Sequence, residues 1–303
     1  MILSASRRTD IPACYSEWFF NRLREGFVLV RNPFNPRRIS RVSLLPESVD
    51  GIVFWTKNPL PILKRLSELE RFPYYVQFTL TPYGRDAEPR LPDKKETLIP
   101  AFLRLSQAVG KERVLWRYDP IFFSARYTFQ YHCLAFRRMA EALAGATELC
   151  TVSFLDYYRN TACHMRPLSV RQETNEERLE LMRCFSQIAG EYGLRLATCA
   201  EEIDLSSLGI SHAACIDAAR LERIGARPLA TRRDPNQRPA CGCAASVDIG
   251  AYDTCPGGCL YCYADHSRSR ILQNIRAHDP RSPLIAGTVG PEDVITERKE
   301  KNT

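Results

Sequence analysis

The sequence predicts an α/β fold, namely a partial (β/α)6 barrel with a cysteine-rich appendage at its C-terminal end. Short apolar, β-rich runs alternate with longer segments of helical periodicity, an order that is typical of a parallel sheet. Six such strand segments are too few to close an eight-stranded barrel. The length of 303 residues, 45% of them hydrophobic, suits one barrel of roughly 200–250 residues plus an appendage.

The strands and helices are predicted from periodicity and from turn residues at their ends. The predicted strands are Ile2–Ser4, Gly51–Trp55, Tyr74–Leu80, Val114–Trp116, Leu149–Phe154 and Leu194–Thr198. The predicted helices are Ser16–Glu25, Pro59–Leu69, Lys95–Val109, Phe129–Leu143 and Glu176–Tyr192, with a short one near Ala214–Ile224. Asn58 before Pro59 is a helix N-cap signal, and Gly110 and Gly193 are placed to end helices.

The chain divides by composition near residue 203. Residues 1–203 contain the predicted barrel, whereas residues 204–303 are rich in Pro, Gly, Arg and Asn and have weak helical periodicity. The last strand of an open barrel ends at its top, so we expect the appendage to fold over the barrel mouth. Seven of the twelve cysteines lie between residues 199 and 262.

Three cysteines, Cys255, Cys259 and Cys262, have the spacing C-x-x-x-C-x-x-C. Thiolates at this spacing can hold three irons of a [4Fe–4S] cluster and leave the fourth iron free to bind another ligand. Gly257 and Gly258 allow a tight loop that turns backbone N–H groups toward the cluster sulfurs. The sequence therefore predicts an iron–sulfur site with an open coordination position.

This run, with an aromatic residue just before its third cysteine, resembles the cluster motif of radical S-adenosylmethionine (SAM) enzymes, and locally that of the spore photoproduct lyase branch. The resemblance implies a six-stranded partial barrel and SAM chelated to the open iron through its amino and carboxylate groups. It also implies reductive cleavage of SAM to a 5′-deoxyadenosyl radical, with an electron donor such as flavodoxin or ferredoxin. The substrate stays unknown, with a nucleic-acid lesion as one option. Those enzymes usually carry the motif after the first barrel strand, whereas here it comes late.

The whole chain, from the segment Ser4–Pro12 to the late cysteines, resembles an uncharacterised bacterial family, the DUF1848 group. That resemblance supports the layout of barrel and late cysteines and implies no substrate.

Polar residues lie at the predicted carboxyl ends of all six strands, which is where the active-site residues of α/β barrels are found. A SAM carboxylate needs a cation and its ribose needs hydrogen-bonding partners, so the candidate SAM-binding residues are Lys57, Asn58, Arg117, Asp119 and Ser153. The segments Thr56–Pro59 and Arg117–Pro120 also resemble strand ends of the photoproduct lyase branch. Alternatively, Asn58 only caps a helix and Arg117 with Asp119 forms a structural ion pair. Arg7, Arg8 and Asp10 are candidates to face substrate.

The remaining cysteines of the dense region number four, the complement of a second [4Fe–4S] cluster or of a zinc ion. They are Cys199, Cys215, Cys241 and Cys243. The alternative is that Cys199 and Cys215 are buried thiols. Cys133, Cys150 and Cys184 are predicted as buried thiols within helices and a strand.

The net charge of +7 comes mainly from arginine and predicts a basic solvated surface, which permits nucleic-acid binding without indicating it strongly. The sequence contains no apolar run of membrane-spanning length and no signal-peptide pattern at its start, so we expect a cytoplasmic protein without a membrane partner. The alternative function is a zinc- or iron–sulfur-containing binding protein without SAM chemistry. A structural zinc site is closed and would not need polar strand ends.

Overall fold

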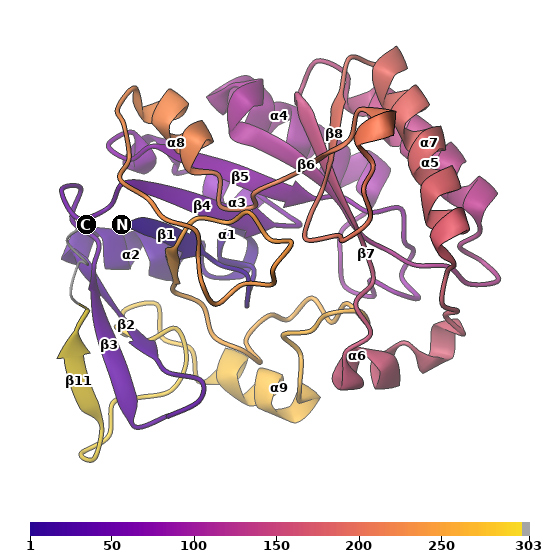
Figure 1. Ribbon diagram of the computed structural model, residues 1–303. Coiled ribbons are helices and arrows are strands. Elements are labelled where there is room, and N and C mark those ends of the chain that lie inside the picture. The colour runs from indigo at the N-terminus through magenta and orange to yellow at the C-terminus, as the bar shows by residue number, and fades with distance from the viewer. Residues whose placement is uncertain (299–303) are drawn as a thin grey trace.

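The computed structural model describes residues 1–298, and describes residues 159 and 160 by their backbone only. Its main sheet has eight strands, all parallel, in the order β10-β1-β4-β5-β6-β7-β8-β9 (Figure 1). The strands are β1 (Ile2–Ala5), β4 (Gly51–Thr56), β5 (Tyr74–Thr79), β6 (Val114–Ile121), β7 (Leu149–Phe154), β8 (Arg195–Thr198), β9 (Ser211–His212) and β10 (Ser246–Asp248). β9 and β10 form the two edges, so the described strands make an open sheet.

The six predicted strands are confirmed as β1 and β4 to β8, and the parallel α/β class is confirmed with them. The predicted count of six was too low, because β9 and β10 come from the C-terminal region. These two strands have two and three residues, too few for a periodic pattern.

A second, three-stranded sheet was not predicted. It consists of β2 (Phe27–Arg31) and β3 (Arg38–Ser43), which form an antiparallel hairpin, and β11 (Val294–Glu297), which pairs in parallel with β3. Figure 1 shows this sheet beside the main one, next to α2. The last described strand, β11, therefore pairs with a strand from near the start of the sequence.

Each of the six predicted helices lies near its expected position, and three further α-helices of the described chain, Ile11–Cys14, Arg159–His164 and Arg268–Arg276, were not predicted. The α-helices are α1 (Ile11–Cys14), α2 (Ser16–Glu25), α3 (Leu60–Leu63), α4 (Ile99–Val109), α5 (Phe129–Leu143), α6 (Arg159–His164), α7 (Asn175–Glu191), α8 (Ala218–Gly225) and α9 (Arg268–Arg276). Short 3-10 turns lie at Leu66–Leu69, Lys111–Arg113, Arg166–Leu168 and Ser206–Leu208, and a π-helical turn at Lys94–Leu98 precedes α4. The predicted bounds of α2 and α5 are the observed ones. The predicted helix Pro59–Leu69 is instead α3 followed by a 3-10 turn.

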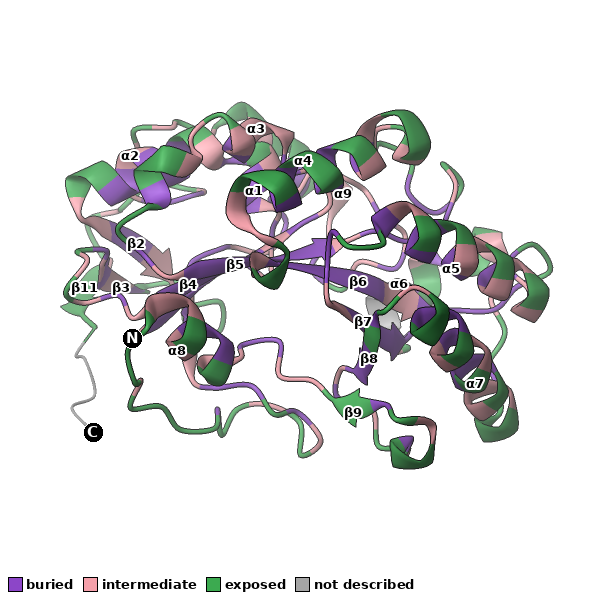
Figure 2. Cartoon of the chain, turned by 90° about the horizontal axis from the view of Figure 1, so that it is seen from above, coloured by how far each residue is buried: buried purple, intermediate pink, exposed green. Residues whose placement is uncertain are grey.

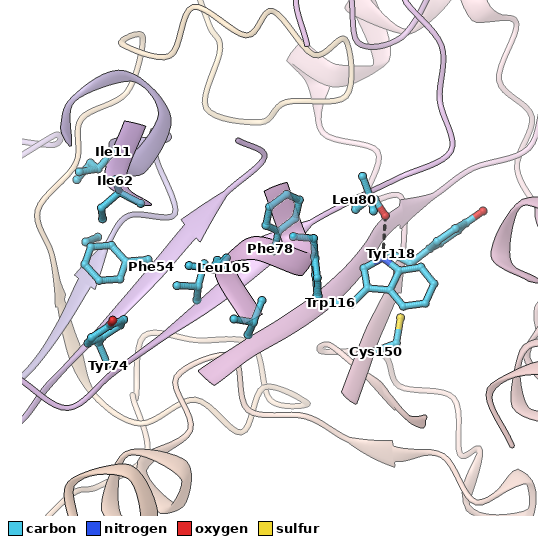
Figure 3. Close-up of a cluster of buried hydrophobic side chains, with 14 of the residues drawn as sticks. Ile11, Phe54, Ile62, Tyr74, Phe78, Leu80, Leu105, Trp116, Tyr118 and Cys150 are labelled. Atoms are coloured by element: carbon cyan, nitrogen blue, oxygen red, sulfur yellow. Dashed lines mark hydrogen bonds between the residues drawn. The ribbon is translucent and has the colours of Figure 1, made fainter. Parts of the chain in front are cut away.

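Successive residues of each strand face opposite sides of the sheet, and both sides are buried. Leu3, Phe54 and Trp116 belong to the core on the side of α2 to α5. Figure 2 shows α2, α3 and α4 along this face and α8 on the other. Figure 3 shows the aromatic part of this core, where the Trp116 indole donates a hydrogen bond to the Leu80 carbonyl at 2.9 Å. Burying each large apolar side chain stabilises the fold by about 1.5–3 kcal/mol.

The opposite face is covered by the C-terminal region. Ile2, Val53 and Leu115 share a buried cluster with Cys215, Ile216, Leu221, Cys241, Cys243 and Ala244. Gly51 allows a close approach here, since a Cβ on it would stand 2.7 Å from a Leu221 methyl group. Residues after 203 thus pack on the sheet and add strands to it. The division into domains at residue 203 stays a prediction.

Three scattered cysteines lie in the helix-side core. Cys150 is a buried thiol, as predicted. Cys133 of α5 and Cys184 of α7 were predicted as thiols but form a disulfide between the two helices. Among the described residues, no helix is both long and apolar enough to cross a membrane.

Candidate functional site

Strand β10 explains how a late motif reaches the carboxyl edge of the sheet. It pairs in parallel with β1, with Ser246 opposite Ile2 and Asp248 opposite Ser4. The Asp248 carboxylate accepts hydrogen bonds from the hydroxyls of Ser4 (2.7 Å) and Ser6 (2.6 Å) and from the backbone N–H of Arg7 (2.8 Å). The chain that leaves β10 toward Cys255 therefore starts where the first strand ends.

The three-cysteine loop turns N–H groups toward its sulfurs. Gly258 has φ of 65°, which suits glycine in a tight turn. The backbone N–H groups of Gly257 and Asp10 lie near the Cys255 sulfur and favour its thiolate. Contact with the Cys14 thiol and these N–H groups together lower the pKa of Cys255 despite its burial. Burial raises the pKa of Cys262 to about 12 and also raises that of Cys259.

A buried charge network joins this loop to two other strand ends. Glu88, in the loop after β5, is 2% exposed and pairs with Lys57 (Nζ to Oε1, 2.8 Å) and with Lys94. Its carboxylate also accepts hydrogen bonds from the hydroxyls of Thr81, at 2.7 Å, and of Tyr261, which lies inside the cysteine motif. Burial alone would raise the pKa of Glu88, but the two lysines outweigh it and lower the pKa to about 2.

The five candidate SAM-binding residues fall into three places. Lys57 lies beside the motif, where its Nζ donates to the Tyr261 hydroxyl at 2.7 Å, and Asp119 is near enough to contribute to its raised pKa. Arg117 forms an ion pair with Asp119 and donates to the Cys215 sulfur at 2.9 Å, on the side of the second cysteine group. Asn58 accepts from the Leu60 N–H at 3.2 Å, a local helix-start contact, and Ser153 at the end of β7 donates to Glu201, which follows β8, at 3.1 Å.

The residues proposed to face substrate serve other contacts in this structure. Arg8 donates to Asp248 at 3.0 Å, and Asp10 accepts from the backbone N–H of Lys57 at 2.7 Å. The Arg7 guanidinium lies in the field of Asp248, Cys243 and Cys215, between the two cysteine groups.

The structure brings the four cysteines of the second group together. The sulfurs of Cys199 and Cys215 are 2.9 Å apart, and Cys215, Cys241 and Cys243 share one buried cluster, where their thiols perturb one another's pKa. In the described part of the chain, no three His, Cys, Asp or Glu side chains are arranged to hold a single metal ion. In a [4Fe–4S] cluster each cysteine binds a different iron, so its ligands do not meet at one point. Metal binding by this group stays a prediction.

Two residues beside the three-cysteine loop were missed by sequence reasoning. Cys14, at the end of α1, contacts the Cys255 sulfur. Arg268 begins α9, and its Nη1 would lie 3.6 Å from a Cβ on Gly258, while its Nη2 is buried without a hydrogen-bond partner. Cys14 has no local spacing signal, because it reaches the loop through the fold; Arg268 lies six residues after Cys262, but no pattern of residues marks it.

A cleft of about 650 Å³ opens at the carboxyl ends of β7 and β8. Its walls include Asp156, Arg178, Glu201 and Arg238, and it borders residues 200 and 240, next to Cys199 and Cys241. A polar cleft of this volume is of the size that holds a small-molecule ligand.

The fold and the site thus define an α/β protein with an open parallel sheet and two cysteine groups, one at its carboxyl edge and one on a covered face. Residues 2–264 match the family described as Domain of unknown function (DUF1848), and the chain belongs to that family. The matched range includes both cysteine groups. A search of curated proteins finds no match.

Proposed function

We propose that this protein is a radical SAM enzyme whose [4Fe–4S] cluster is held by Cys255, Cys259 and Cys262. The observation that carries the proposal is the position of β10, an edge strand beside β1 that delivers the three cysteines to the carboxyl edge of the sheet. The enzymes that this motif resembles carry it after the first barrel strand. A loop that follows β10 has a comparable place although it comes late in the sequence.

The residues around the loop suit an anionic iron–sulfur group. Backbone N–H groups already point at the Cys255 sulfur, and the unpartnered Nη2 of Arg268 is a buried donor beside the loop. The Lys57 ammonium lies in the field of the Cys259 sulfur. The aromatic rings of Tyr83 and Phe122 pack in the same buried cluster as Cys259 and keep water from that side.

When bound, the cluster and SAM supply a one-electron cleavage that yields methionine and a 5′-deoxyadenosyl radical, which removes hydrogen from a substrate. The protein must orient SAM and exclude water. Lys57 is the best placed of the five candidates, since it follows β4 and donates to the Tyr261 hydroxyl inside the cysteine motif; Asp119 lies within β6 and acts electrostatically on Lys57. Arg117 positions Asp119 through their ion pair.

The four-cysteine group is proposed as a second, fully ligated centre for electron transfer or structure. Four thiolates carry a large negative charge, and the guanidinium groups of Arg117 and Arg7 lie in contact with this group or in its field. Metal analysis separates the options: about eight irons per chain for two clusters, or about four with one zinc. An iron content near four with no zinc would leave this group as thiols.

The test of the proposed function is product formation under anaerobic conditions. Protein reconstituted with iron and sulfide and reduced with dithionite should convert SAM to 5′-deoxyadenosine, measured by mass spectrometry. Changing Cys255, Cys259 and Cys262 to alanine should abolish the product, because the open-iron cluster loses its ligands. Cys163→Ala changes an exposed thiol of α6 and serves as the control. A triple variant that makes 5′-deoxyadenosine at the parental rate would show that the assignment is wrong.

A further inference from the structure

Helix α1 is held against the three-cysteine loop from its first residue. Asp10 caps the helix by accepting the Ala13 N–H at 3.0 Å, while its other oxygen accepts the Lys57 N–H at 2.7 Å. The backbone N–H of Asp10 is near enough to the Cys255 sulfur to help lower the pKa of that thiol. The start of α1 is thus connected to both the end of β4 and the cysteine loop.

The end of α1 is held in the same way. Tyr15 follows the helix, is 4% exposed, and its hydroxyl donates to the carbonyl of Thr254 at 2.5 Å. Thr254 immediately precedes Cys255 and is itself fully buried. Cys14 therefore lies in a helix turn that is hydrogen-bonded at its start to the end of β4 and after its end to the cysteine loop, and little freedom is left for its backbone.

Cys14 brings a fourth thiol to a three-cysteine site. Cys14 precedes Tyr15, whose hydroxyl bonds to the residue before Cys255, and its thiol is near enough to perturb the pKa of Cys255, while the residue remains exposed to solvent. Four thiols are the complement that saturates a [4Fe–4S] cluster. The contact does not belong to the four-cysteine group, whose members bond among themselves and to Arg117.

We propose that Cys14 binds the fourth iron of the cluster while SAM is absent and is displaced when SAM binds. This inference rests on the proposed function. In the exchange the iron–sulfur bond to Cys14 breaks, the α-ammonium group of SAM loses a proton, and bonds from iron to the resulting amine and to the SAM carboxylate form. The released Cys14 thiolate takes up one proton, so the protons balance. No electron is transferred. The exposure of Cys14 gives the released thiol access to water, and its contact with Cys255 keeps it near the site.

The test uses the loss of iron on oxidation, because an iron without a protein thiolate is lost more readily to leave a [3Fe–4S] cluster. The reconstituted full-length protein is treated with ferricyanide without SAM, and the [3Fe–4S] signal is followed by electron paramagnetic resonance. Wild type should convert slowly, and Cys14→Ala should convert at least about tenfold faster. A second cluster with four cysteines should contribute little to the signal. Cys163→Ala is the control and should behave as wild type.

Cys14→Ser retains the size of the side chain and a hydroxyl, and it should convert as fast as the alanine variant. Iron content after reconstitution verifies that each variant still carries the cluster. Equal conversion rates in wild type and in either folded variant would overturn the role of Cys14. If the cluster converts slowly in wild type and faster in both variants, Cys14 is a ligand of the cluster. If, in addition, SAM does not change the spectrum of the reduced cluster, the proposed SAM chemistry is rejected while the role of Cys14 stands.

Discussion

The change Glu88→Gln tests the buried charge network that connects the cysteine loop to the ends of β4 and β5. Glutamine preserves the size of the side chain and can still accept the Thr81 hydroxyl, but leaves Lys57 and Lys94 without a negative partner. The pKa of Glu88 falls from 4.5 to about 2 in the folded protein. A shift of this size corresponds to about 3 kcal/mol of stability at pH 7. Removing one partner of a buried pair costs about 3–5 kcal/mol, which is consistent.

The assay is urea unfolding at pH 7, followed by circular dichroism. Glu88→Gln should lower the free energy of unfolding by about 3 kcal/mol. Because the folded-state pKa of Glu88 is lowered, its contribution is present above pH 4.5 and is lost as the pH falls through about 2, so the two proteins should converge in acid. Glu191→Gln, which alters an exposed ion pair with Arg137, should change little. A Glu88→Gln variant as stable as wild type at pH 7 would refute the network.

Two further changes test the attachment of the C-terminal region and the core around α5. Asp248→Ala removes a partly buried carboxylate that accepts hydrogen bonds from Ser4, Ser6 and Arg8, and should cost up to about 3–5 kcal/mol in urea unfolding and speed proteolysis after β10. Unchanged proteolysis would contradict the pairing of β10 with β1. His132 is fully buried, which lowers its pKa from 6.5 to about 4. Because the folded state favours the neutral ring, the free energy of unfolding of wild type should fall by up to about 3 kcal/mol as the pH falls from 6.5 toward 4. His132→Gln should lack this loss between pH 7 and 4.5, and an identical pH profile would show that the histidine is not the cause.

The strands that the sequence predicts are those whose own residues carry the signal. Gly51–Thr56 and Leu149–Phe154 are apolar and buried on both faces, so a short run of apolar residues is enough to identify them. Strand β10 has no such signal, because three residues become a strand only through pairing with the free edge of β1. The hairpin of β2 and β3 was missed although Phe27–Arg31 is an apolar run, since its turn contains two prolines and reads as a loop.

The residues of the candidate site likewise fall into those that a local sequence pattern marks and those that no such pattern marks. The two cysteine groups were predicted from local spacing and from their density in the chain, and the structure shows each group in contact with charged residues of the barrel strands or the loops after them. Glu88 and Cys14 could not be predicted, because each reaches the loop from a segment distant in sequence, and Arg268 follows the loop closely but has no pattern that marks it. Their contribution depends on burial and partners, such as the two lysines that hold Glu88 ionised. Neither the burial of a residue nor the identity of its partners can be read from the spacing of residues in the sequence.

The central claim is that Cys255, Cys259 and Cys262 hold a cluster whose fourth iron binds SAM. Electron–nuclear double resonance of the reduced, reconstituted protein with SAM labelled with ¹⁵N at its amino group tests it most directly. The account predicts a ¹⁵N hyperfine coupling to the cluster in wild type, which is absent from the triple alanine variant. A reduced cluster at these cysteines that shows no coupling and an unchanged spectrum with SAM would contradict it.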